Sequence, residues 1–171
     1  EKITMLRIIV LLIRGIFCVP YWVMTMAKWN KTGKGTEKER YDYLFPCVNW
    51  VVKHANVNMI VSGVEKLPQE GGYMISPNHQ GMFDAFMLLS THVKPLTAVF
   101  KIELTTTPIV KHIATFLNAY AMDRSNLRES IKVIRQVGED IKKGRVVVIF
   151  PEGTRSKQGN IMGEFKGGSF K

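Results

Sequence analysis

The chain has 171 residues, of which 46% are hydrophobic, and carries a formal net charge of +10. This length and composition fit one well-packed domain with an appendage, and they exclude a disordered, collagen-like or disulfide-rich chain. Its two cysteines, Cys18 and Cys47, have no CxxC or Cys/His spacing, so neither a metal site nor a redox pair is expected. The positive charge indicates an anionic partner, and its scattered distribution favours a membrane surface or a phosphorylated substrate over nucleic acid.

The first apolar segment, residues 3–26, predicts a helix that lies in the headgroup region of a membrane. Polar residues spaced seven apart form a narrow stripe on this helix, and its members are Arg7, Arg14, Tyr21 and Lys28. A transmembrane helix and a signal peptide are the alternatives, but both would carry arginines inside their apolar part. Pro20 is expected to kink or break the helix at about Val19. The predicted location is the cytoplasmic face of the cell membrane, on an anionic surface.

A polar turn at 30–38 and a second helix at 39–57 complete an N-terminal two-helix membrane-associated module, residues 1–56. Residues 57–171 follow as a separate α/β domain that is expected to be truncated, because the chain stops at Lys171 without a helix stop.

In this second domain, short β-rich runs alternate with helical ones. The predicted strands are 58–62, 73–76, 96–100 and 146–150. Helices are predicted at 84–91 and at 126–143, and the apolar face of the second comprises Leu127, Ile131, Ile134, Val137 and Ile141. The alternation predicts an α/β fold with a mostly parallel sheet flanked by helices.

A polar cluster at 77–84 directly follows the strand predicted at 73–76. His79 and Asp84 would lie about 140° apart on a continuous helix, so they meet only if the chain turns between them, and Gly81 would permit that turn. Asp84 would then accept a hydrogen bond from one imidazole nitrogen and leave the other free to take a proton from an alcohol. The alternative is a surface loop with an incidental histidine.

Two further polar clusters follow apolar runs. At 150–156, backbone amides near Gly153, the Thr154 hydroxyl and the Arg155 guanidinium would form a cradle for a phosphate, although a simple polar turn also explains them. At 121–124, Arg124 either faces an anion or forms a local ion pair with Asp123.

These clusters resemble the sequence blocks of the glycerolipid acyltransferases. Residues 78–84, NHQGMFD, resemble the family's Asn-His, four residues, Asp signature, and residues 150–156, FPEGTRS, resemble its Phe-Pro-Glu-Gly-Thr-Arg-Ser block. Between them, KIEL at 101–104 and AMDR at 121–124 resemble two intervening blocks, although the family often has Ile-Pro-Val-Asp-Arg in the second. The resemblance covers residues 57–171 and is greatest to the members that acylate lysophosphatidic acid.

The resemblance implies that His79 is a general base and that Asp84 orients it. It also implies that the acceptor's glycerol and phosphate are bound by Glu152, Gly153, Thr154 and Arg155, with added positive charge from Lys101 and Arg124. The implied reaction moves a fatty acyl group from acyl-CoA or acyl carrier protein to the free sn-2 hydroxyl of 1-acyl-sn-glycerol-3-phosphate, which gives phosphatidic acid. No serine or cysteine of the His79 cluster is placed as a nucleophile, so direct attack by the acceptor is expected, without a metal or bound cofactor. The alternatives are another acceptor, such as glycerol 3-phosphate or another lysolipid, and a non-catalytic membrane-binding module.

Overall fold

The structure is a computed structural model that describes residues 9–11, 13–81, 83–155, 163 and 165. Its centre is a four-stranded sheet in the order β1-β4-β2-β3, and every pair of neighbouring strands is parallel. The strands are β1 (Tyr73–Ile75), β2 (Leu96–Lys101), β3 (Tyr120–Met122) and β4 (Val146–Val148). The predicted α/β class with a parallel sheet is therefore confirmed.

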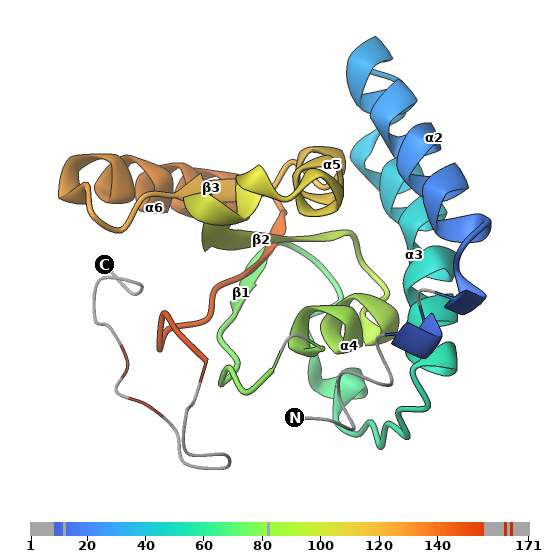
Figure 1. Ribbon diagram of the computed structural model, residues 1–171. Helices are drawn as coiled ribbons and strands as arrows, with labels where there is room; N and C mark the ends of the chain where they lie inside the picture. Colours follow the sequence, from blue (N-terminus) through green and yellow to red (C-terminus); the bar gives the residue numbers. More distant parts are fainter. Residues whose placement is uncertain (1–8, 12, 82, 156–162, 164, 166–171) are drawn as a thin grey trace.

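Helices connect the strands and cover both faces of the sheet. The connecting helices are α4 (Asp84–Thr91), α5 (Pro108–Phe116) and α6 (Leu127–Lys142), and two short 3-10 turns are η1 (Val64–Lys66) and η2 (Ile102–Thr106). The α4 and α5 helices pack on one face, where Val146 and Val148 point, whereas α6 packs on the other face, against Val147 (Figure 1). Because β4 is buried on both faces, its sequence is an unbroken β-branched run.

Two antiparallel helices, α2 (Cys18–Thr32) and α3 (Glu37–His54), precede the sheet. Thr36 begins α3 with a capping box: its hydroxyl accepts from the Glu39 amide, and the Glu39 carboxylate accepts from the Thr36 amide at 2.7 Å. The helices pack through large aromatic rings, including an edge-to-face contact of Trp22 with Trp50 at 5.5 Å. The two predicted helices are therefore present.

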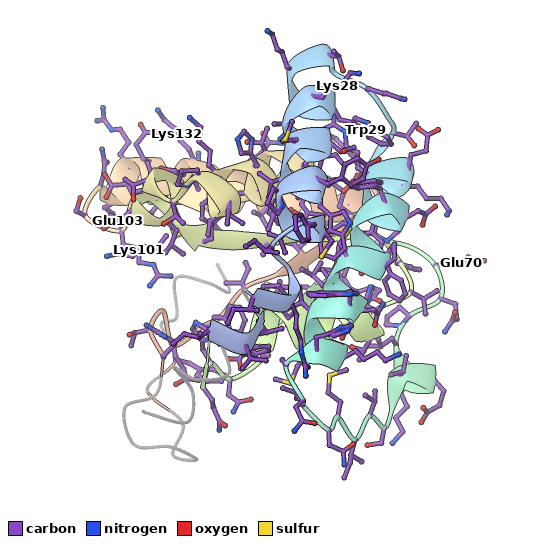
Figure 2. The ribbon with its side chains drawn as sticks, turned by 45° about the vertical axis from the view of Figure 1, so that its right-hand side comes forward. Lys28, Trp29, Glu70, Lys101, Glu103 and Lys132 are labelled. Carbon is purple, nitrogen blue, oxygen red and sulfur yellow. The ribbon has the colours of Figure 1, made fainter. Side chains whose placement is uncertain are left out.

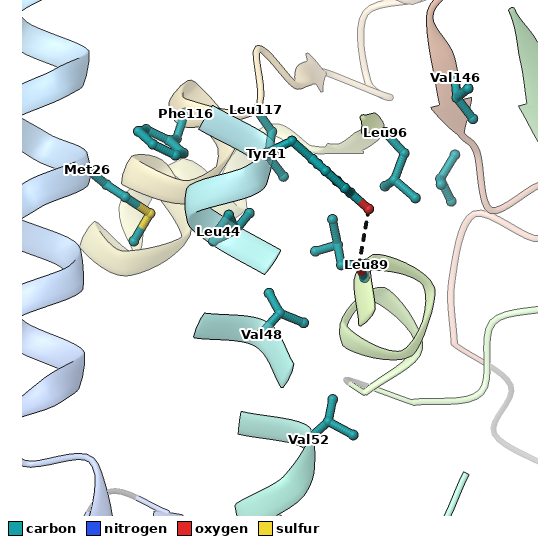
Figure 3. Close-up of a cluster of buried hydrophobic side chains, with 11 residues drawn as sticks. Met26, Tyr41, Leu44, Val48, Val52, Leu89, Leu96, Phe116, Leu117 and Val146 are labelled. Carbon is teal, nitrogen blue, oxygen red and sulfur yellow. Dashed lines mark hydrogen bonds between the residues drawn. The ribbon is translucent and has the colours of Figure 1, made fainter. Parts of the chain in front are cut away.

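These N-terminal helices share one hydrophobic core with the sheet. Figure 3 shows Met26 beside Phe116, and Tyr41 and Val48 beside Leu89, all within one cluster of buried side chains. The buried hydroxyl of Tyr41 donates to the carbonyl oxygens of Leu89 and His92, at 3.1 and 2.9 Å, which ties α3 to the end of α4. The division of the chain at residue 56 into a module and a domain stays a prediction.

The break in the N-terminal apolar segment is not where it was predicted. The helix is interrupted by a turn at 15–17 rather than at about Val19. Pro20 lies in the first turn of α2, where backbone amides have no acceptor within the helix, so the missing amide proton of proline breaks no hydrogen bond. Arg7 lies outside the described residues. None of the described helices combines the length and apolarity needed to cross a bilayer.

Two other predictions need correction, and two elements were not predicted. Residues 58–62 form no strand, because the run buries little: Ile60 is 94% exposed and Val61 also faces solvent. The α5 helix and β3 were not predicted, although Pro108 in the first turn of α5 is a helix-start signal. On α6, Leu127 and Ile131 are exposed, because the short strands beneath contact only the later part of the helix.

Candidate active site

The register of the sheet brings the loops after β1 and β4 together. Ile75 pairs with Val148, and the Ile149 amide extends this ladder by donating to the carbonyl of Ile75 at 2.9 Å. His79 and Glu152 each lie four residues beyond these paired positions, and parallel strands end at the same edge of a sheet. The backbone amide of His79 accordingly donates to Oε1 of Glu152 at 2.8 Å.

His79 and Asp84 form a direct contact across a turn. Nδ1 of His79 lies 2.7 Å from Oδ2 of Asp84, the first residue of α4. The same oxygen accepts from the backbone amides of Gln80 and Gly81, at 2.7 and 3.0 Å. Gly81 does not adopt the left-handed conformation, so the expectation that its conformational freedom permits the turn is wrong. The carboxylate of Asp84 holds the turn instead.

The hydrogen bonds of Asp84 decide the tautomer of His79. Burial raises the pKa of Asp84, but hydrogen bonds from the Gly81 amide, the His79 ring and the Gln80 amide outweigh it, and the net pKa lies below its usual value. An ionised carboxylate only accepts, so in the neutral imidazole of His79 the proton is assigned to Nδ1 and the lone pair to Nε2. Within the part of the chain that the structure describes, Nε2 has no hydrogen-bond partner, and the side chain is 24% exposed. His79 is thus an oriented base with access to solvent.

Phe150 supports the imidazole from one side. Its ring centroid lies 4.1 Å from that of His79, at an interplanar angle of 30°. Phe150 also begins a turn, because its carbonyl accepts from the amide of Gly153 at 3.0 Å. Gly153 has a φ of 71°, which favours glycine at this position. Sequence reasoning missed the contact of Phe150 with His79, although Phe150 is the first residue of the FPEGTRS block.

Glu152 is buried at the centre of this arrangement, with 3% of its surface exposed. Its Oε1 accepts from the His79 amide, and its Oε2 accepts from the Gly163 amide at 2.8 Å. These two hydrogen bonds, that from His79 first, hold the pKa of Glu152 below its usual value. The carboxylate is therefore ionised at neutral pH and engaged at both oxygens.

The predicted cationic residues lie along the same edge of the sheet. Lys101 ends β2 and pairs with Glu103 at 2.8 Å, and Figure 2 shows the two side chains together. Lys101 is opposite Met122 in the register of β2 and β3, which places Arg124 two residues beyond that edge. Arg155 is exposed in the loop after β4, as is Thr154.

The cations do not touch the histidine. Across the described residues, no hydrogen bond or ion pair joins Lys101, Arg124 or Arg155 to His79. The carboxylate of Asp123 accepts from the amide and hydroxyl of Ser125, and no ion pair with Arg124 forms among these residues. The edge therefore combines an imidazole that can accept a proton with separate, solvent-facing cations, an arrangement suited to proton removal from a molecule that carries a negative charge.

Comparisons with known proteins found a family and several relatives of this chain. A model of the Acyltransferase family matches residues 58–171. The 1-acyl-sn-glycerol-3-phosphate acyltransferase of Pseudomonas aeruginosa is 36% identical over 115 residues, which cover 67% of this chain and 44% of that protein. A probable 1-acyl-sn-glycerol-3-phosphate acyltransferase of Mycoplasma pneumoniae is 30% identical over 137 residues, which cover 77% of this chain and 50% of that protein. The chain spans about half the length of the curated relatives it matches.

The fold also has a counterpart among solved structures. The crystal structure of the 1-acyl-sn-glycerophosphate acyltransferase PlsC from Thermotoga maritima matches with a TM-score of 0.64 and 22% identity, over 92% of this chain and 68% of that chain. At this identity the likeness shows the fold alone. Because the family model covers well over half of the chain, including the loops that carry His79 and Glu152, the chain belongs to the Acyltransferase family.

Proposed function

We propose that this chain transfers a fatty acyl group from acyl-CoA or acyl carrier protein to the sn-2 hydroxyl of 1-acyl-sn-glycerol-3-phosphate, which gives phosphatidic acid. The observation that carries the proposal is the contact of His79 with Asp84, which leaves Nε2 as a base at the carboxyl edge of the sheet. The names of the relatives support this acceptor, since the proteins from P. aeruginosa and M. pneumoniae are both named for it.

The proposed chemistry is a single displacement at the thioester carbonyl. The acceptor hydroxyl attacks the carbonyl carbon while Nε2 of His79 takes its proton, which gives a tetrahedral intermediate and an imidazolium paired with Asp84. Collapse of the intermediate forms the ester and breaks the bond from carbon to sulfur. The imidazolium returns its proton to the departing thiolate, so the products are phosphatidic acid and a free thiol. General-base catalysis of this kind contributes about a hundred- to ten-thousandfold in rate.

The acceptor's phosphate is proposed to bind to the exposed cations at the same edge. Arg155 offers a planar fork of donors that matches phosphate oxygens, and the Thr154 hydroxyl lies beside it in the chain. Lys101 and Arg124 add positive charge further along the edge, beyond β2 and β3. All four side chains face solvent, as a site for a soluble or membrane-borne headgroup requires.

We also propose that α2 rests on the cytoplasmic face of an anionic membrane. Its outward surface carries large apolar side chains, among them Phe17, Tyr21 and Met24, which are 87%, 66% and 71% exposed. Lys28 follows one turn later on that surface. An exposed apolar strip beside a basic residue, on a chain with a net charge of +10, suits a helix that lies in the headgroup region.

An acyl-transfer assay with several acceptors tests the proposal. Purified protein is incubated with labelled acyl-CoA, or with labelled acyl carrier protein, and with vesicles that contain lysophosphatidic acid. We expect labelled phosphatidic acid from one or both donors. Faster turnover of glycerol 3-phosphate or lysophosphatidylcholine would show another acceptor. Binding to vesicles without turnover of any acceptor would identify a non-catalytic membrane-binding module.

A further inference from the structure

Two carboxylates hold the loop of His79 through three consecutive backbone amides. The amide of His79 donates to Glu152 at 2.8 Å, and the amides of Gln80 and Gly81 donate to Asp84 at 2.7 and 3.0 Å. Asp84 also contacts the imidazole, so it fixes the direction of the ring. Among the described residues, the hydrogen bond that Glu152 accepts from His79 comes from the backbone amide, so Glu152 fixes the position of the His79 backbone rather than the direction of its ring.

Glu152 offers almost no accessible surface to a substrate. Oε1 is occupied by the His79 amide and Oε2 by the Gly163 amide, while the residue is 3% exposed. Gly163 approaches so closely that a Cβ at that position would lie 2.9 Å from Oε2. A hydroxyl of the acceptor would have to open this buried contact to reach the carboxylate, and a buried amide that loses its partner is costly.

Charge also argues against contact with the acceptor's phosphate. The hydrogen bonds to Glu152 lower its pKa, so it is negative at neutral pH and would repel a phosphate. Thr154 and Arg155, which follow in the same loop, are exposed and carry donors suited to that anion. Within this loop, the buried Glu152 therefore contacts the protein backbone, whereas the exposed Arg155 is available to a ligand.

We infer that Glu152 is a positioning residue, which anchors the backbone of His79 by bridging the loops after β1 and β4, and that it is not a ligand of the acceptor. The role departs from the one that family resemblance implies for this residue, and it rests on the proposed function for the catalytic part of His79. A glutamate is required because it supplies two charged acceptors to two backbone donors at once.

The Glu152→Gln variant tests this inference, because an amide offers one acceptor and one donor, so one backbone amide would face an NH2 group. In ¹⁵N-labelled protein without substrate, we expect the His79 amide proton to shift upfield and to exchange with solvent about tenfold faster. With substrates, we expect kcat to fall about tenfold or more while the KM for lysophosphatidic acid changes less than about threefold. Glu139→Gln, on the exposed surface of α6, is the matched control and should change none of these values.

If Glu152→Gln fails to fold, Glu152→Asp keeps both acceptors but places them one methylene further from the amides, and the same changes are expected to a smaller extent. An unchanged His79 amide in the folded variant would overturn the inference. So would a KM for lysophosphatidic acid that rises about tenfold at constant kcat. The amide measurements need no turnover, so they decide the role of Glu152 even if the wild-type protein does not acylate lysophosphatidic acid.

Discussion

Replacing Asp84 by asparagine removes the charge that organises the His79 loop and keeps the shape of the side chain. Oδ2 of Asp84 accepts three hydrogen bonds, from the His79 ring and from the amides of Gln80 and Gly81. A bond to a charged acceptor contributes about 1.5–3 kcal/mol and a neutral one about 0.5–1.5 kcal/mol, so three bonds lose about 3 kcal/mol. The variant no longer buries a charge, which returns part of this loss, and we expect a net destabilisation of about 2 kcal/mol.

The effect of Asp84→Asn on kcat should be larger than its effect on the free energy of unfolding. Without a carboxylate, the tautomer with the proton on Nδ1 is no longer favoured, and the same replacement in serine-protease triads lowers kcat about 10⁴-fold. We expect a loss of about 10³- to 10⁴-fold in kcat for Asp84→Asn, measured by acyl transfer beside urea unfolding. Asp42→Asn is the control, since its pair with Lys38 is exposed and should contribute less than about 0.5 kcal/mol. The reasoning would be refuted if Asp84→Asn had a free energy of unfolding within about 0.5 kcal/mol of the wild type and a kcat within about tenfold of it.

Three further results are expected. Arg155→Ala should raise the KM for a phosphate-bearing acceptor much more than the KM for the acyl donor, and Arg155→Lys should restore it only in part; equal changes for both substrates in steady-state kinetics would contradict the assignment. The pKa values of Asp84 and Glu152 lie below their usual values of 3.8 and 4.5 in the folded protein, so their contribution to stability is present above these values and is lost as the pH falls through the folded-state pKa values. In urea unfolding, the free energy of unfolding of the wild type should therefore decrease below about pH 4.5, and that of Asp84→Asn should decrease less steeply. The same pH dependence in both proteins would contradict a stabilising role for the Asp84 carboxylate. Val147→Ala should cost about 2 kcal/mol in urea unfolding, because this side chain is fully buried in the central strand β4, and a loss below about 0.5 kcal/mol would mean that the sheet is packed differently.

Local sequence signals predicted the elements that flank the site. The predicted helix at 84–91 coincides with α4, and the predicted helix at 126–143 begins at the Asn126 cap, whose side chain accepts from the Glu129 amide. The continuous run of valines predicted β4 because burial on both faces leaves no polar position. Since parallel strands end at one edge, these elements put the polar clusters that follow β1 and β4 at the carboxyl edge of the sheet.

Contacts between distant segments could not be predicted in this way. The bond from His79 to Glu152 spans 73 residues and depends on the register of β1 with β4, which no local pattern specifies. The strand predicted at 58–62 failed for a related reason, because an apolar run shows which residues avoid water but not whether a partner is present to cover them. The same holds for Phe17 and Met24, whose exposure depends on which face of α2 meets α3 and α5.

The measurement that tests the central claim most directly is the rate of acyl transfer by His79→Ala. The side chain of His79 lies in a loop, stacks on Phe150 and donates one hydrogen bond to Asp84, so the variant should keep the circular dichroism spectrum of the wild type and lose no more than about 3 kcal/mol of stability. We predict that kcat falls at least about a hundredfold, the lower limit expected for loss of a general base, while His112→Ala on α5 retains full activity. A folded His79→Ala protein with kcat within about tenfold of wild type would contradict the claim that His79 removes the proton from the acceptor.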